Sequence, residues 1–290
     1  MRSLLFVPAD SERKFARARA SGADALILDL EDSVAAVRRP EARRLLRGFL
    51  DGGRDGQRLF VRINSLAAED ALHDLAAVMP GRPDGVVLPK ATPDDLARLD
   101  HYLDALEVAG RLPRGGTHVI AIATETAAGV FSLGHYRGVT ARLEALTWGA
   151  EDLAALLGAV NRRPDGAYDD TFRLARALCL LAAQAAGVAA VDTIHADFRN
   201  EAALAEECRA AARAGFTAKM AIHPAQVGPI NAAFSPGEED LAWARGVIAA
   251  FAANPDAGTI GVAGRMVDRP HLVLAERILA RAGQGRAGQG

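Results

Sequence analysis

Cysteine is scarce in this sequence, and its placement excludes two classes of protein. The 290 residues include two cysteines, Cys179 and Cys208, both in Ala- and Leu-rich stretches. Neither belongs to a CxxC motif or to a cluster with histidine, so we expect no disulfide framework and no structural zinc site. A reducing, cytoplasmic environment fits this pattern.

Long apolar runs and an excess of one charge are also missing. No run approaches the ~18 residues that a membrane span needs, and the run at residues 4–8 is too short for a signal-peptide core. Lys+Arg is 34 and Asp+Glu is 36, which gives a net charge of −2. The charge balance therefore points to neither nucleic acid nor a membrane surface as a partner.

What the sequence does contain is a series of eight short apolar runs, each followed by a longer helical pattern. Nearly continuous runs of this length suit strands that are buried on both faces, as in a parallel sheet. Eight strand–helix units predict a (β/α)₈ barrel. The alternative, an open doubly wound sheet, often has a Gly-rich turn after its first strand, and no such turn follows the first run of this sequence. The runs lie at residues 4–7, 25–28, 59–61, 85–88, 119–122, 145–148, 189–192 and 219–222.

The pattern changes after the eighth unit. A break rich in Pro and Gly at 233–237 precedes a helical stretch, a small-residue loop and a last helix that ends at about residue 282. We therefore expect a barrel domain at 1–236 and a C-terminal helical extension at 237–282. The repetitive end, 283–290, is expected to be a disordered tail because its composition cannot form a core.

Polar residues follow the apolar runs, at the barrel end where (β/α)₈ enzymes carry their active sites. Carboxylates outnumber cations among them, and this mixture suits a hard divalent cation and an anionic substrate. The candidates are Asp29, Glu31, Asp32, Arg62, Lys90, Glu125, Glu151 and Asp152.

Two of these carboxylates are candidate metal ligands. Glu125 and Asp152 follow neighbouring runs and could both reach one ion, and Mg²⁺ typically takes one or two carboxylates and fills its shell with water and substrate oxygens. The alternative is that either acid caps the helix that follows it. Capping is the stronger competitor for Asp152, because glutamate is a poor N-cap.

The two cations each have two interpretations. Arg62 either forms a salt bridge with a neighbouring strand end such as Asp29 or Glu31, or presents a fixed fork to a substrate oxygen. Lys90 is either a Schiff-base nucleophile, as some aldolases use, or a charge partner for the acidic rim, which we favour.

Three further polar residues stand in the last two runs. His195 and His223 follow strands, so either is a candidate general base or a hydrogen-bond donor to another site residue. Lys219 begins its run, which predicts a place at the opposite end of the barrel.

At these residues the sequence resembles the HpcH/HpaI aldolase and citrate lyase family, in its citrate lyase β-subunit-like branch. The resemblance runs from residue 2 to about 282 and is specific for the branch but not for the substrate. It is carried in order by RSLLFVPAD (2–10), GADALILDLEDSV (22–34), VRIN (61–64), VVLPKA (86–91), ATETAAGV (123–130), WGAEDLAALLGA (148–159), GFTAKMAIHPAQV (215–227), AFSPGEED (233–240) and GRMVDRPHL (264–272).

The resemblance implies a Mg²⁺-dependent carbon–carbon lyase that acts on acyl-CoA or acyl-carrier-protein thioesters. The family's metal-binding residues fall on Glu125, which also contacts substrate, and on Asp152. Its substrate-binding arginine falls on Arg62. An aspartate that acts in a neighbouring subunit's site falls on Asp268, which implies a homotrimer or a multiple of trimers such as a hexamer.

The resemblance leaves the acyl group open among malyl, citramalyl and citryl thioesters. It leaves open cleavage, condensation and thioester hydrolysis as well. The alternatives are a pyruvate-type class II aldolase that uses no CoA, and a non-catalytic acyl-CoA-binding protein or citrate lyase subunit. The last of these would need α and acyl-carrier partners, which one chain cannot reveal.

Overall fold

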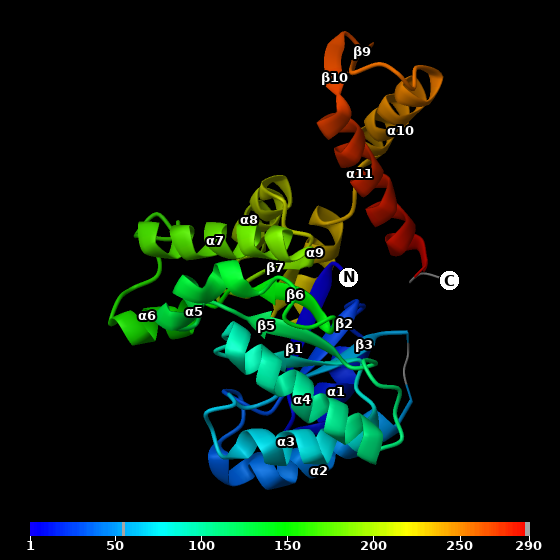
Figure 1. Ribbon diagram of the computed structural model, residues 1–290. Coiled ribbons are helices and arrows are strands. Elements are labelled where there is room, and N and C mark those ends of the chain that lie inside the picture. The colour runs from blue at the N-terminus through cyan, green and yellow to red at the C-terminus, as the bar shows by residue number, and fades with distance from the viewer. Residues whose placement is uncertain (54–55, 288–290) are drawn as a thin grey trace.

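The centre of the molecule is a closed barrel of parallel strands that pair in chain order, with β8 returning to β1 (Figure 1). This computed structural model describes residues 1–53 and 56–287. Each predicted run falls on one strand, so the predicted (β/α)₈ barrel is confirmed. The strands are β1 (Ser3–Pro8), β2 (Ala25–Asp29), β3 (Arg58–Arg62), β4 (Gly85–Leu88), β5 (His118–Ile122), β6 (Leu143–Thr147), β7 (Ala189–Asp192) and β8 (Ala218–Ala221).

Helices alternate with the strands and surround the barrel. Local chemistry sets their ends: Thr92 and Asp95 form a capping box at the start of α4, and α7 and α8 end at left-handed glycines, Gly187 and Gly215. The helices are α1 (Glu12–Arg19), α2 (Arg39–Asp51), α3 (Asp70–Val78), α4 (Pro93–Ala109), α5 (Ala127–Ser132), α6 (Ala150–Leu157), α7 (Asp170–Ala186), α8 (Glu201–Ala214) and α9 (Val227–Ala233).

Two apolar layers hold these elements together. A large cluster fills the space between strands and helices, and a smaller one fills the barrel interior. Ala25 and Ile27 of β2 and Phe60 of β3 belong to the inner cluster. Since successive side chains of a strand point to opposite faces, Asp29 and Arg62 continue these inward-facing series. The strand pattern therefore directs both groups into the mouth of the barrel.

The C-terminal segment forms an appendage with an apolar cluster of its own, in which Leu241, Val247 and Phe251 are buried. It consists of α10 (Glu238–Ala253), the antiparallel pair β9 (Thr259–Val262) and β10 (Arg265–Asp268), and α11 (Arg269–Ala287). Figure 1 shows the β9–β10 hairpin at the outer end of this appendage, away from the barrel strands.

The last helix is longer than the predicted one, because α11 continues to Ala287 rather than ending at about residue 282. Residues 288–290 of the predicted tail lie outside the described residues, and the predicted domain limits stay a prediction. Within residues 1–53 and 56–287, no helix has the length and apolarity needed to cross a bilayer.

Candidate active site

A cavity of about 360 Å³ lies at the carboxyl ends of the barrel strands. Its apolar wall includes Phe6, Trp148 and Met220. The charged groups that line it are Asp29, Asp32, Arg62, Glu125, Glu151 and Asp152. The structure thus brings most of the sequence-predicted polar residues to one place, as the barrel topology requires.

Arg62 is anchored by carboxylates that follow β2. Its Nε and Nη2 each donate to one oxygen of Asp29 at 2.7 Å, and its Nη1 lies 3.3 Å from Glu31 and 3.2 Å from Asp32. Burial opposes ionisation of Asp29, but the guanidinium contacts outweigh it and hold the pKa of that carboxyl below its usual value. The salt bridge considered for Arg62 therefore exists, and the side chain still borders the cavity.

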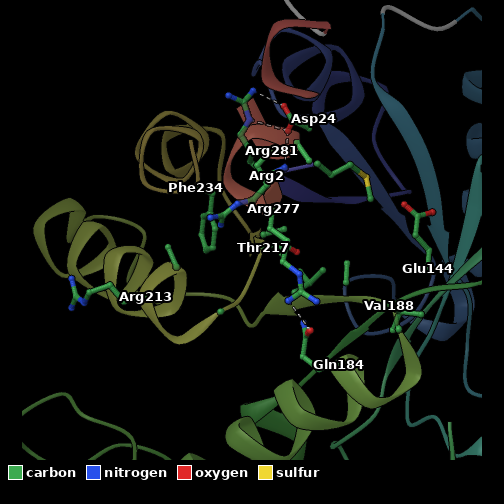
Figure 2. Close-up of a pocket in the computed structure, with 18 of the residues that line it drawn as sticks. Arg2, Asp24, Glu144, Gln184, Val188, Arg213, Thr217, Phe234, Arg277 and Arg281 are labelled. Carbon is green, nitrogen blue, oxygen red and sulfur yellow. Dashed lines mark hydrogen bonds and ion pairs between the residues drawn. The ribbon is translucent and has the colours of Figure 1, made fainter. Parts of the chain in front are cut away.

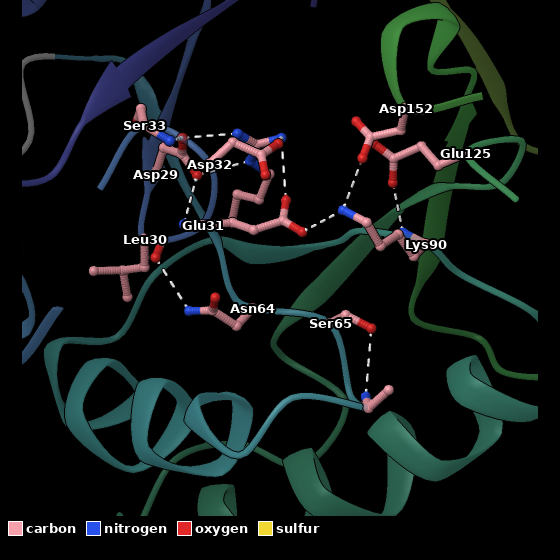
Figure 3. A network of polar contacts seen from close by, with 12 residues as sticks. Asp29, Leu30, Glu31, Asp32, Ser33, Asn64, Ser65, Lys90, Glu125 and Asp152 are labelled. Atoms are coloured by element: carbon pink, nitrogen blue, oxygen red, sulfur yellow. Dashed lines mark hydrogen bonds and ion pairs between the residues drawn. The ribbon is translucent and has the colours of Figure 1, made fainter. Parts of the chain in front are cut away.

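Lys90 joins the two halves of the site (Figure 3). Its Nζ lies 2.7 Å from Glu31 and 3.0 Å from Asp152. Burial lowers the pKa of Lys90, but Glu31 and the neighbouring carboxylates outweigh this effect and raise it. An ammonium ion held between two carboxylates is a poor nucleophile. The geometry therefore favours the charge-partner interpretation over a Schiff base.

Of the two carboxylates considered as metal ligands, Glu125 and Asp152, Glu125 is the less exposed to solvent. Its side chain is 4% exposed and accepts one hydrogen bond of 2.6 Å, from the backbone N–H of Lys90. Burial, reinforced by the charge of Asp152, raises the pKa of Glu125 to about 8. A buried carboxylate with one donor beside a second carboxylate is a place where a cation would be stabilised.

The backbone around Glu125 leaves room for this arrangement. Gly149 lies against the glutamate, and a Cβ atom at that position would come within 2.6 Å of the Glu125 Cγ. Lys90 holds a left-handed backbone conformation, with φ of 51°, which directs its N–H to Glu125. The local fold is therefore built around the position of this carboxylate.

The donor set fits a magnesium ion. Glu125 and Asp152 are hard oxygen ligands that approach the same space, as Figure 3 shows. Among residues 1–53 and 56–287 no three acidic, histidine or cysteine side chains converge as a metal site. A site of two carboxylates, completed by water and substrate oxygens, is what Mg²⁺ usually takes.

The two candidate histidines have other partners. His195 is buried with its Nδ1 3.1 Å from Glu207, and His223 stacks on Phe198 with ring centroids 4.7 Å apart. Neither histidine lines the cavity. The prediction of a general base among them gains no support from these contacts.

Lys219 is the second residue of β8 rather than its first, and it is not an exposed group at the opposite end of the barrel. Its side chain is fully buried, 3.1 Å from Asp192. Asp192 also accepts hydrogen bonds from Trp148 and Arg176. The sequence pattern missed this network because its members come from four separate segments of the chain.

Asp268 lies at the end of β10, outside the cavity of its own chain. Its carboxylate contacts Nδ1 of His271, and this contact lowers the pKa of Asp268. The side chain of Asp268 is 39% exposed. Asp268 is therefore a partly exposed carboxylate on the β9–β10 hairpin that does not contribute to the cavity of its own chain.

A parallel barrel whose carboxyl-end cavity is lined by carboxylates and a buried arginine, with a lysine paired to one of those carboxylates, is typical of metal-assisted barrel enzymes. The family model "HpcH/HpaI aldolase/citrate lyase" matches residues 2–224, more than half of the chain. This chain belongs to that family, and the predicted family and lyase class are confirmed.

Similar proteins share nearly the whole length. A citrate lyase subunit beta-like protein of Mycobacterium tuberculosis (strain CDC 1551 / Oshkosh) is 41% identical over 97% of this chain and 95% of its own. A (3S)-malyl-CoA thioesterase of Cereibacter sphaeroides (strain KD131 / KCTC 12085) is 35% identical, with coverage of 97% and 94%.

A solved structure agrees with the fold as well. The crystal structure of protein CitE from Mycobacterium tuberculosis, in complex with magnesium, acetoacetate and coenzyme A, is 40% identical to this chain. The TM-score is 0.80, with coverage of 97% of this chain and 98% of that one. The magnesium in that structure agrees with the cofactor predicted for this chain.

Proposed function

We propose that this protein is a Mg²⁺-dependent carbon–carbon lyase that cleaves a 3-hydroxyacyl-CoA thioester to acetyl-CoA and an oxo acid. The observation that carries the proposal is the convergence of Glu125, Asp152 and Arg62 at one cavity. The family supports it, as does the coenzyme A bound in the related M. tuberculosis structure. Malyl-, citramalyl- and citryl-CoA all have the required hydroxyl and carboxylate.

Glu125 and Asp152 would hold the metal. A bound Mg²⁺ supplies Lewis-acid polarisation of the substrate oxygen that becomes the carbonyl of the oxo acid. Lys90 positions both carboxylates, since its backbone N–H binds Glu125 and its Nζ lies beside Asp152. The buried setting of Glu125 excludes water from one side of the site and strengthens electrostatic contacts there.

Arg62 would stabilise the negative charge that develops on the thioester oxygen during cleavage. Asp29 binds Nε and Nη2 and fixes the plane of the guanidinium, while Nη1 lies beside Glu31 and Asp32 and the residue lines the cavity. A donor that is held in place before reaction costs no reorganisation when the charge forms.

Asp268 would transfer the proton at the carbon of the acetyl fragment, in the site of a neighbouring subunit. The described lining of this chain's cavity contains no residue of the appendage, and the hairpin lies at the appendage's outer end. The contact with His271 orients the carboxylate. We therefore propose a homotrimer or hexamer whose subunits complete one another's sites, and a catalytic barrel at 1–236 with a reaching extension at 237–282.

A coupled assay tests the proposed function. Purified protein with Mg²⁺ is offered malyl-, citramalyl- and citryl-CoA, and acetyl-CoA, free CoA, glyoxylate, pyruvate and oxaloacetate are measured. EDTA-sensitive release of acetyl-CoA with one oxo acid is expected, whereas free CoA without acetyl-CoA would indicate a thioesterase. No turnover by protein that binds Mg²⁺ would contradict the free-standing lyase and favour a subunit that needs a carrier protein and α partners.

Two further arms separate the remaining alternatives. Cleavage of a free hydroxy-oxo acid without CoA would identify a pyruvate-type class II aldolase. Borohydride trapping of substrate on Lys90 would identify a Schiff-base aldolase, which the ion pairs of that lysine disfavour.

Mixed oligomers test the role of Asp268. Asp268→Ala and Arg62→Ala subunits, each inactive alone, should regain part of the activity when they are mixed, because some sites then combine an intact Arg62 with an intact Asp268. A complete failure to regain activity in mixed oligomers of verified composition would contradict action between subunits.

A further inference from the structure

A second cavity lies at the other end of the barrel, between the amino ends of the strands and α11. Its volume is about 630 Å³. Residues before β1 and β2 and at the starts of β7 and β8 form one side, and the α11 residues Leu274, Arg277, Ala280 and Arg281 form the other (Figure 2). It shares no lining residue with the candidate active site in the described part of the chain.

The acidic groups of this cavity are already neutralised. Asp24 accepts hydrogen bonds from the backbone N–H of Arg2 at 2.6 Å and from its guanidinium at 2.8 Å and 3.1 Å. Glu144 is paired with both terminal nitrogens of Arg58. Neither carboxylate is left over to balance a further positive charge.

No carboxylate of the described residues forms an ion pair with either of the two α11 arginines that line the cavity. Arg277 and Arg281 are one helical turn apart and face the same cavity. Arg277 donates to the neutral amide oxygen of Gln184 at 3.4 Å, as Figure 2 shows. The Nε of Arg281 is buried and has no hydrogen-bond partner among the described residues. A buried guanidinium nitrogen without an acceptor is costly and favours an anionic ligand.

A third arginine adds to the positive charge. Arg213 lines the cavity, and its contact with Glu206 is long, 3.4 Å, while Glu206 is bound more closely by Arg209 at 2.7 Å. The rest of the lining is largely small and apolar, including Val188 and Phe234. The cavity therefore offers guanidinium forks at one side and an apolar wall at the other.

We propose that this cavity is a binding site for a small polyanion that carries carboxylate or phosphate groups, held by Arg277 and Arg281. Guanidinium forks match both kinds of anion. α11 begins directly after Asp268, so an anion bound there would also restrain the helix that carries this aspartate. That consequence rests on the proposed function, whereas the binding itself does not.

A competing explanation is that the arginines hold α11 against the barrel. α7 and α8 end at Gly187 and Gly215, beside the cavity, and the C-terminal ends of helices attract cations. A docking role predicts that the arginines act without any ligand. An anion site predicts saturable binding that depends on them.

Calorimetric titration of the full-length protein with inorganic phosphate and with citrate separates the two explanations. The buffer holds EDTA and little chloride, so that neither a metal nor a competing anion contributes. The key variant is Gln184→Glu, which places a carboxylate beside Arg277 with almost no change in shape. The double variant Arg277→Gln with Arg281→Gln removes both charges, and Arg173→Gln, an exposed arginine of α7 paired with Asp170, is the matched control.

The site predicts one bound anion per chain in the wild type. Affinity should fall by about tenfold or more in Gln184→Glu and in the double variant, and stay unchanged in Arg173→Gln. An Arg62→Met variant should bind as the wild type does, because it alters the opposite barrel end. The affinities for phosphate and citrate are then compared. The anion that binds more tightly shows whether the site prefers phosphate or carboxylate groups.

Three results would overturn the site. The first is no binding of either anion by the wild type. The second is equal affinity in Gln184→Glu and wild-type protein. The third is loss of binding in Arg62→Met protein that circular dichroism shows to be folded, which would assign the anion to the active-site cavity. Because no turnover is measured, failure of the lyase assay would leave this test intact.

Discussion

Two buried arginines, Arg62 and Arg142, each face three carboxylates, but the surroundings of the two clusters differ. Arg142 is 3% exposed and lies 2.8 Å from Asp100, 2.6 Å from Asp104 and 2.7 Å from Glu107. Arg62 is 11% exposed and borders the active-site cavity. The same residue types thus form one closed cluster and one open cluster.

The two clusters also differ in how completely the carboxylate oxygens are hydrogen-bonded. In the closed cluster, both oxygens of Glu107 accept from Arg142, and the backbone N–H groups of Gly115 and Thr117 add two more hydrogen bonds. In the open cluster, Oε2 of Glu31 faces Arg62 at 3.3 Å but accepts no hydrogen bond. Complete pairing indicates a structural role, and an unfinished network beside a cavity indicates a place for a ligand.

The largest expected effect is on turnover, from Arg62→Lys. Lysine keeps the charge beside Asp29 but loses the planar fork. We expect the rate constant for cleavage to fall by about 10²–10³-fold. The loss of stability should be smaller than in the closed cluster, because water in the adjoining cavity can solvate the carboxylate oxygens that lose a donor. Steady-state kinetics and urea unfolding of the same preparation check both halves, and unchanged turnover would place the functional site elsewhere.

Arg142→Lys should have the opposite result, with lower stability and unchanged turnover. A single ammonium group cannot replace the contacts to Asp100, Asp104 and Glu107, and the free energy of unfolding should fall by about 3 kcal/mol. Turnover per folded molecule should stay at the wild-type value. A variant as stable as the wild type would show that the closed cluster does not stabilise the fold.

Acidic pH should lower the stability of the fold by protonating a carboxylate of the closed cluster. We expect this effect to be smaller than that of Arg142→Lys. Contacts with Arg142 and Thr117 overcome the effect of burial and hold the pKa of Glu107 at about 2, below its unfolded value. A lowered folded pKa gives stability that is present above the unfolded pKa and is lost as the pH falls toward the folded one.

For Glu107 this loss amounts to about 2 kcal/mol between pH 7 and pH 3. Denaturant unfolding across that range measures it in the wild type, and Glu107→Gln should show a shallower decline. If the two proteins lost stability in parallel over this range, the ion pairs of Glu107 would not be its source.

The barrel could be predicted from sequence because each strand is a local apolar run, and eight of them recur in order. Glu125, Asp152 and Arg62 could be placed at the same end because parallel strands share their carboxyl edge. The sequence also predicts that Lys90 is a charge partner of the acidic residues. It does not indicate that the two partners are Glu31 and Asp152.

Other features depend on contacts that no local pattern records. Asp100, Asp104 and Glu107 look like an ordinary polar face of α4 until Arg142 meets them from another element. The second cavity likewise requires α11 to fold back over the amino ends of the strands. These are long-range contacts, and the sequence alone does not rank them.

The central claim is that the open cluster, together with the adjoining carboxylates Glu125 and Asp152, forms a magnesium-dependent lyase site. Glu125→Gln tests this claim most directly. Wild-type and variant protein are compared on malyl-, citramalyl- and citryl-CoA across a range of Mg²⁺ concentrations, with EDTA as the blank. The account predicts metal-dependent release of acetyl-CoA by the wild type and a loss of about 10²–10³-fold in the variant. Undiminished turnover by the variant, or turnover by the wild type in EDTA, would contradict it.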